Sequence, residues 1–244
     1  MTYCVGMRLA RGLVFMSDTR TNAGVDNVSV FKKMSIFSEP GERCITILSA
    51  GNLATTQAVV SILEERTKAP AERRPSILEA PTMFQVANLV GETLREVIEA
   101  QASPGQQRAD STFHASLIIG GQIAGMTPRL FLVYPEGNFI EASEDTPFFQ
   151  IGETKYGKPI LVRAYDRDMS FEDAVKLLMV SFDSTLKANL SVGLPLDLHV
   201  YEEASLKEGV TRRISADDSY FNMVASNWGQ ALKDAFHALP KYKF

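Results

Sequence analysis

The second residue of the chain is a threonine that follows the initiator methionine. Removal of Met1 would place a hydroxyl nucleophile and a free α-amine on the same residue, Thr2. The amine has an unperturbed pKa of about 7.7–8.0, so it can accept the proton of the hydroxyl near neutral pH without a histidine. Met-Thr is a common start, so the residues that follow must decide whether Thr2 is a candidate nucleophile.

A short hairpin is predicted directly after Thr2. Residues 2–9 and 13–17 are apolar, strand-like runs, and the Gly-containing segment 10–12 between them is typical of a turn. The second run ends at Asp18. The hairpin therefore brings a carboxylate back toward the beginning of the first strand.

Two adjacent lysines lie in a third extended stretch, residues 28–37. A lysine inside an apolar strand costs free energy unless its charge is paired, and Asp18 at the end of the neighbouring strand is a suitable partner. Neighbouring residues of a strand point to opposite faces, so only one of Lys32 and Lys33 can be exposed at a strand edge. The pattern predicts one buried lysine paired with Asp18.

Thr2, Asp18 and the lysine pair, in this order and spacing, resemble the β-type subunits of the proteasome and the bacterial HslV protease. That family begins with a mature threonine, continues to an Asp-Ser-Arg-Ala-Thr-like turn and presents a lysine on the next strand. The resemblance covers most of the chain, and further matching segments are residues 48–54, 115–121, 128–137, 150–152 and 191–193. Within the family, residues 151–159 and 191–198 resemble most closely the bacterial group called Anbu.

The family resemblance implies an α+β fold, a four-layer αββα sandwich of the N-terminal nucleophile hydrolase type. Residues 1–244 are expected to form a single domain. Strands are predicted within the first 48 residues, between residues 113 and 151, and over residues 196–201 and 210–214. Helices are predicted over residues 53–66, 82–102, 155–165 and 170–190, and from a cap at 217–219 to residue 239.

The resemblance also implies catalytic roles. Thr2 would attack a peptide carbonyl, Lys33 would provide a positive charge beside the hydroxyl, and Asp18 would hold the lysine ammonium. Lys33 is chosen over Lys32 because the second lysine of the pair occupies the matching position in HslV. The backbone N–H of Gly51, at a turn that opens a helix, is the candidate oxyanion donor.

A small, neutral specificity pocket is expected from Thr21, Ser49 and Leu53. Thr21 would also offer backbone groups to an extended substrate, although an ordinary turn residue is as good an interpretation. The pocket leaves open whether the substrate is a peptide or a small amide. Two further interpretations remain open: a small-molecule amidase or transferase of the same fold, and a structural ring subunit with little activity.

The accessory residues of the family are only partly present. Ser191 matches an accessory serine, but Ala188 stands where the family has an aspartate, and Glu153 stands where it has a second serine. Weak activity, a need for assembly, or another substrate class would follow from these departures.

Composition excludes several classes of protein. A formal net charge of −4 and a hydrophobic fraction of 45% are typical of a globular protein and give no basic region suited to nucleic acid. No apolar run has the length of a membrane span. Two cysteines without a targeting segment favour the reducing cytoplasm, with Cys4 buried as a small hydrophobe. The three histidines are far apart, so no metal site and no cofactor is predicted.

Self-association is predicted for the helix pair 53–66 and 82–102. This pair carries apolar rows together with mixed charges, and the corresponding helix pair of the resembling family packs one subunit against others. Such rows would be costly if they were exposed on a monomer. The chain is therefore expected to form a large homo-oligomer, and the resemblance to Anbu implies an open, helically rising ring.

Overall fold

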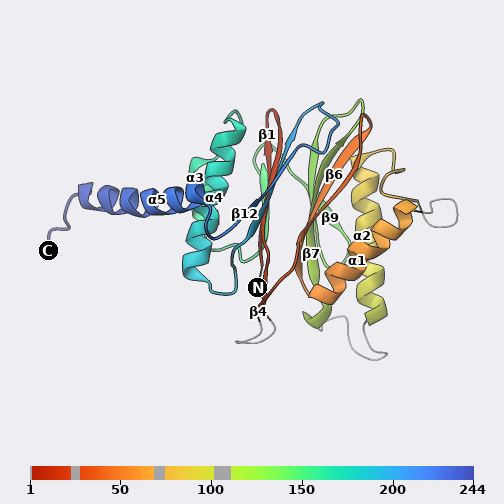
Figure 1. Ribbon diagram of the computed structural model, residues 1–244, viewed down its shortest axis with the longest axis horizontal. Helices are drawn as coiled ribbons and strands as arrows, with labels where there is room; N and C mark the ends of the chain where they lie inside the picture. The colour runs from red at the N-terminus through yellow and green to blue at the C-terminus, as the bar shows by residue number, and fades with distance from the viewer. Residues whose placement is uncertain (1, 23–27, 69–74, 102–110) are drawn as a thin grey trace.

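Two five-stranded antiparallel sheets lie face to face between two layers of helices (Figure 1). The computed structural model describes residues 2–22, 28–68, 75–101 and 111–244. The strands are β1 (Tyr3–Leu9), β2 (Gly12–Asp18), β3 (Arg20–Asn22), β4 (Val28–Val30), β5 (Met34–Glu39), β6 (Arg43–Gly51), β7 (Ala115–Ile123), β8 (Arg129–Val133), β9 (Phe139–Glu141), β10 (Phe148–Gly152), β11 (Leu196–Glu202) and β12 (Val210–Ile214). The first sheet has the order β10-β1-β2-β11-β12 and the second the order β5-β6-β7-β8-β9, while β3 and β4 form a separate two-stranded sheet.

The helices divide between the outer faces of the two sheets (Figure 1). The helices are α1 (Leu53–Lys68), α2 (Met83–Gln101), α3 (Lys158–Ala164), α4 (Phe171–Ala188) and α5 (Ser219–Ala238). A short 3-10 helix at Ser111–Phe113 precedes β7. Helices α1 and α2 cover the second sheet, and α3 and α4 cover the first. The cap predicted at residues 217–219 is confirmed, because Asp218 accepts from the N–H of Phe221. Ser170 caps α4 in the same way by accepting from the N–H of Asp173.

Three apolar clusters fill the three spaces between the four layers. Phe131 belongs to the cluster between the second sheet and its helices, Phe182 to the cluster under α3 and α4, and Phe15 to the cluster between the sheets. Every residue of β2 is buried, because this strand is covered by a helix layer on one face and by the other sheet on the opposite face. The predicted α+β fold with a four-layer αββα arrangement is confirmed.

The stretch 28–37 is not one strand, as the sequence suggested. It consists of β4 and β5, and the intervening residues Phe31, Lys32 and Lys33 have no regular structure. Strand β4 pairs with β3, whereas β5 pairs with β6 in the second sheet, so the chain must pass from one sheet to another between them. Both lysines lie in this crossing.

The apolar rows of α1 and α2 are not exposed, which corrects the basis of the predicted assembly surface. Val59 and Leu63 of α1, and Val86 and Leu94 of α2, are fully buried in the subunit's own core. Among the described residues of these two helices, Phe84 is the large apolar side chain that remains exposed. The rows are explained by packing against the second sheet, and the prediction that this helix pair joins subunits has no support from exposed apolar surface.

The antiparallel pairing of β1 and β2 positions the candidate nucleophile. Cys4 lies opposite Ser17, so the beginning of β1 meets the end of β2, and Thr2 comes close to Asp18. On the other side of β1, the carbonyl of Thr2 accepts a hydrogen bond from the N–H of Glu153 at 2.6 Å. Thr2 is therefore held between two strands of the first sheet.

Candidate active site

A buried ion pair joins Asp18 to Lys33. Lys33 Nζ lies 2.7 Å from Asp18 Oδ1 and also donates to the carbonyl of Arg20 at 2.6 Å. Asp18 is fully buried and Lys33 is 5% exposed. The ammonium is thus fixed by two oxygens, and the predicted pairing of a buried lysine with Asp18 is confirmed.

Asp18 also receives two backbone donors. The N–H of Tyr3 donates to Oδ1 at 3.0 Å, and the N–H of Gly193 donates to Oδ2 at 3.3 Å. Burial raises the pKa of Asp18, while the Lys33 ammonium and these two N–H groups act in the opposite direction. Asp18 therefore links Lys33, the strand that starts at Thr2 and the turn around Gly193.

Lys32 has the opposite environment to Lys33. Lys32 is exposed, and the described part of the chain contains no ion pair that involves it. Lys33 is the buried lysine, as the family resemblance implied. Strand alternation is not the reason that only one of the two lysines is buried, because neither lysine lies in a strand. The crossing between two sheets turns Lys33 toward Asp18 and leaves Lys32 at the surface.

Gly51 ends β6 two residues before α1 begins. Its φ of +119° lies in a region that disfavours side chains, and a Cβ at this position would meet the carbonyl oxygen of His114 at 2.4 Å. Asn52 accepts from the N–H of Thr55 at 3.1 Å and thereby caps the helix start. The predicted setting of Gly51, a turn that opens a helix, is confirmed.

One cavity collects most of the predicted site residues. It has a volume of about 470 Å³, and it is lined by Thr2, Thr21, Lys32, Lys33, Ser49, Ala50, Gly51, Leu53, Thr56 and Gly152. Thr2 is 8% exposed at this cavity, and the residues of the predicted pocket, Thr21, Ser49 and Leu53, all line it. Thr56 was not predicted, although its position three residues after Leu53 on the same helix face was available as a signal.

Ser191 is not brought to the cavity. Its N–H donates to Asn189 Oδ1 at 2.9 Å, in the turn that follows α4. The turn contributes to the site through Gly193 instead, whose N–H binds Asp18. Gly193 was not chosen from the sequence, because its contact with Asp18 joins residues 175 positions apart and the family resemblance pointed to Ser191.

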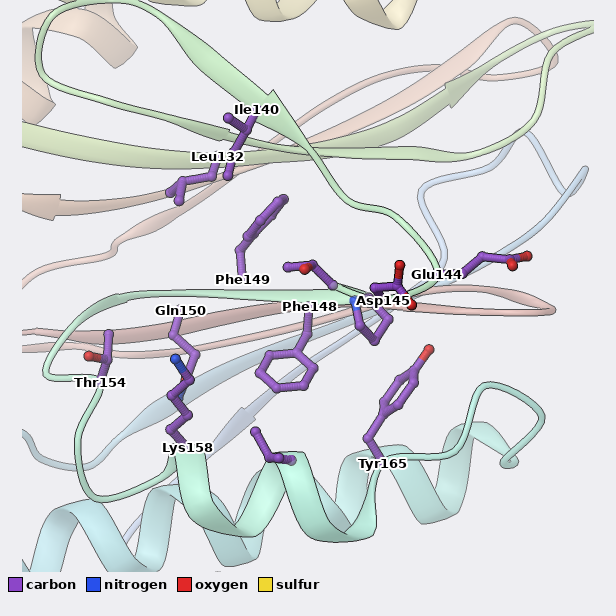
Figure 2. Close-up of a pocket in the computed structure, with 13 residues that line it drawn as sticks. Leu132, Ile140, Glu144, Asp145, Phe148, Phe149, Gln150, Thr154, Lys158 and Tyr165 are labelled. Carbon is purple, nitrogen blue, oxygen red and sulfur yellow. The ribbon is translucent and has the colours of Figure 1, made fainter.

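A larger cavity lies at another edge of the sandwich, where β9 and β10 end the two sheets (Figure 2). It has a volume of about 670 Å³. Figure 2 shows Phe149 pointing toward Leu132 and Ile140 of the second sheet, while Phe148 points toward α3. None of the predicted catalytic residues lines this cavity, so the smaller one is the candidate active site.

The reactive side chains Cys4 and His199 are buried outside the candidate active site. Cys4 is fully buried, and burial raises the pKa of its thiol, as expected of a small hydrophobe. His199 lies between the sheets, with Nδ1 2.8 Å from Thr46 Oγ1, and burial lowers its pKa. Across the described segments, no cluster of His, Cys, Asp and Glu is suited to a metal ion. A search of the same segments finds no helix with the length and apolar character needed to cross a membrane.

Comparisons with known proteins agree with the geometry. Residues 2–193 match the model of the proteasome subunit family. A proteasome subunit beta 2 from Pyrobaculum calidifontis is 25% identical over 209 residues, which cover 84% of this chain and 90% of the relative.

Solved structures give a more specific match. Anbu (ancestral beta-subunit) from Yersinia bercovieri is 47% identical, covers 99% of both chains and superposes with a TM-score of 0.93. A structure described as the helical assembly of the Anbu complex from Pseudomonas aeruginosa is 45% identical, covers 99% of this chain and 98% of that one, and has a TM-score of 0.92. The chain therefore belongs to the proteasome subunit family, and within it to the Anbu group.

Proposed function

We propose that this protein is an N-terminal threonine hydrolase that cleaves amide bonds, with peptides as the substrate class, and that it acts as a self-assembling subunit. The observation that carries the proposal is the buried pair of Lys33 and Asp18, 2.7 Å apart, beside a cavity that Thr2 lines. A fixed cation in the same cavity as a hydroxyl favours the ionised form of that hydroxyl and so activates it as a nucleophile. Neither histidine nor metal is needed for this chemistry.

The reaction requires Thr2 to become the N-terminus. Its α-amine then accepts the proton of Oγ1 as this oxygen attacks the carbonyl carbon, and returns the proton to the leaving nitrogen as the C–N bond breaks. Water attacks the resulting ester in the same way, which releases the acid and restores Thr2. The Lys33 ammonium stabilises the negative charge that develops on the attacking oxygen.

The N–H of Gly51 is the backbone donor that stabilises the negative charge on the substrate oxygen. Gly51 lines the cavity at the end of β6, just before the positive end of the α1 dipole. A side chain at residue 51 is excluded by the His114 carbonyl. We propose that an extended peptide binds with its scissile carbonyl at Gly51, its side chain between Ser49, Leu53 and Thr56, and its backbone beside Thr21.

Intact mass spectrometry with a peptide epoxyketone tests the proposal. This electrophile forms one bond to the hydroxyl and a second bond to the α-amine of an N-terminal threonine. An adduct attached through both atoms therefore requires a free Thr2 amine. The expected result is a chain that lacks Met1 and carries one adduct. A chain that retains Met1 and still hydrolyses peptide substrates would contradict the mechanism.

Helix α5 supports the self-assembling part of the proposal. Figure 1 shows α5 leaving the side of α4 and projecting away from the body. Trp228 packs against the core under α4, and the same helix face continues through Leu232, Phe236 and Leu239, which are 51%, 71% and 65% exposed. Since the Pseudomonas aeruginosa structure, described as a helical assembly, matches 99% of this chain, we propose that α5 packs against a second copy.

Changing the exposed apolar face of α5 is expected to disrupt assembly. Leu232→Glu with Phe236→Glu places two carboxylates where an apolar contact with another subunit is proposed, while the subunit core keeps all its residues. Light scattering should show the species of high mass replaced by chains near the 26.9 kDa of one subunit. Lys233→Glu, a charge change on a neighbouring position of the same helix, is the control and should leave the mass unchanged. An unchanged mass of the double variant would show that α5 is not the contact.

A further inference from the structure

A closed circuit of hydrogen bonds surrounds the beginning of β1, and two of its side chains have no assigned role. The circuit runs from the Thr2 carbonyl through Glu153 and Asn189 to the turn at residues 191–193, and returns through Asp18 to the N–H of Tyr3. Glu153 and Asn189 are the side chains that join the two ends of this circuit.

Glu153 lies directly beside Thr2. Its N–H donates to the Thr2 carbonyl at 2.6 Å, and Gly152 makes this approach possible, because a Cβ on Gly152 would lie 1.9 Å from the same oxygen. The Glu153 residue is 8% exposed. Its carboxylate accepts from the N–H of Lys155 at 3.3 Å and from Asn189 Nδ2 at 3.0 Å. A buried carboxylate needs such donors, so Glu153 and Asn189 depend on each other.

Asn189 connects the carboxylate to the turn after α4. Its Nδ2 donates to Glu153 while its Oδ1 accepts from the N–H of Ser191 at 2.9 Å. Reversing the amide would place an oxygen against the carboxylate and a donor against an N–H, so only one orientation satisfies both partners. Asn189 also ends α4, where its own N–H donates to the carbonyl of Thr185. The amide therefore fixes the turn relative to the helix.

The turn at residues 190–193 is hydrogen-bonded to the surroundings of the Asp18–Lys33 ion pair. Two residues beyond Ser191, the N–H of Gly193 donates to Asp18 Oδ2. Arg20, whose carbonyl holds the Lys33 ammonium, donates through Nη1 to the carbonyl of Leu190 in the same turn at 2.9 Å. The position of the turn thus acts on both partners of the ion pair.

We propose that Glu153 and Asn189 are positioning residues for the Thr2 reaction. Together they fix the position of Thr2 relative to the Asp18–Lys33 ion pair. The inference rests on the proposed function of Thr2. Neither Glu153 nor Asn189 lines the candidate cavity. Their loss should therefore lower kcat and leave KM nearly unchanged, because substrate binding uses the cavity wall and not this circuit.

Exchanging the two functional groups gives a sharp test. Asn189→Asp alone sets two carboxylates against each other, and Glu153→Gln alone sets two amides against each other. In the double variant, the introduced amide donates to the introduced carboxylate. That carboxylate also accepts from the N–H of Ser191, and the oxygen of the introduced amide accepts from the N–H of Lys155, so the hydrogen bonds that join residues 153 and 189 to each other and to these two N–H groups are restored.

The expected effects on kcat follow from this pairing. We expect kcat to fall about 100-fold for Asn189→Asp and about 10-fold for Glu153→Gln, since misplacement by about 1 Å can cost 10²-fold. The double variant should return to within about 3-fold of the wild type, a coupling that independent sites do not show.

A matched pair elsewhere serves as the control. Asn88 Nδ2 donates to Glu92 Oε1 at 3.0 Å on the exposed face of α2, and the variants Asn88→Asp, Glu92→Gln and their combination should leave kcat unchanged. If the double variant at 153 and 189 is no more active than Asn189→Asp, the positioning role is overturned.

The proposed function can fail independently of this inference. The proposed hydrolase function would be refuted by a wild-type protein that lacks Met1 and yet neither cleaves peptides nor reacts with the epoxyketone. The circuit is then judged by hydrogen exchange of the peptides that contain residues 2–9 and 150–155. Faster exchange in Asn189→Asp that is reversed in the double variant supports the positioning of Thr2 by Glu153, and unchanged exchange overturns it.

Discussion

Replacing Thr2 with alanine is expected to abolish amide hydrolysis while the fold remains intact. The variant lacks the only hydroxyl that the mechanism uses, whereas the hydrogen bond that Thr2 accepts from Glu153 uses the backbone carbonyl, which alanine keeps. Loss of a nucleophile together with its proton transfer should exceed the roughly 10²–10⁴-fold contribution of general base catalysis. Turnover of a fluorogenic peptide and epoxyketone labelling measure the loss.

Thr2→Ser is the control for this change. Serine keeps the hydroxyl and the α-amine and should retain measurable hydrolysis and labelling, whereas alanine should show neither. Equal turnover in the alanine variant and the wild type would mean that a different residue attacks the substrate.

Replacing Lys33 with methionine should impair both stability and activity. Methionine is similar in length but leaves Asp18, which is fully buried, without its cation. Breaking a buried ion pair by removing one partner costs about 3–5 kcal/mol, and loss of one preorganised electrostatic donor costs about 10²–10³-fold in kcat. Urea unfolding and peptide turnover report the two effects separately.

Two further variants separate stability from catalysis. Asp18→Asn with Lys33→Met removes both charges and should recover part of the free energy of unfolding, yet it should stay inactive because the cation is still missing. Lys32→Ala should leave the free energy of unfolding unchanged and lower turnover only slightly, since Lys32 is exposed at the cavity. If Lys32→Ala proves to be the inactive variant, the assignment of the two lysines is reversed.

The parts of the site that depend on residue type could be predicted from the sequence. Thr2 and Asp18 follow from a hairpin, which fixes their distance through local pairing alone. Gly51 is implied by the family resemblance, and its positive φ gives the physical reason for a glycine at this turn. These features depend on residues close in sequence, where turn and cap chemistry determine the structure.

The parts that depend on long-range packing could not be predicted. The break at residues 31–33 arises because β4 and β5 pair in different sheets, and a single apolar stretch does not reveal that change of partner. The link between Glu153 and Asn189 joins residues 36 positions apart through side chains that also suit an exposed turn. Likewise, the periodic pattern of α5 is that of a packed helix and does not show that part of its apolar face is left uncovered.

The bond between Gly193 and Asp18 has a consequence for the order of events during synthesis. The two residues are 175 positions apart, so the carboxylate lacks one of its donors until residue 193 has left the ribosome. Contacts of such sequence separation form late, because a long loop must close before they contribute. The hydrogen bonds around Asp18, and with them the proposed active site, are therefore complete only in a nearly finished chain.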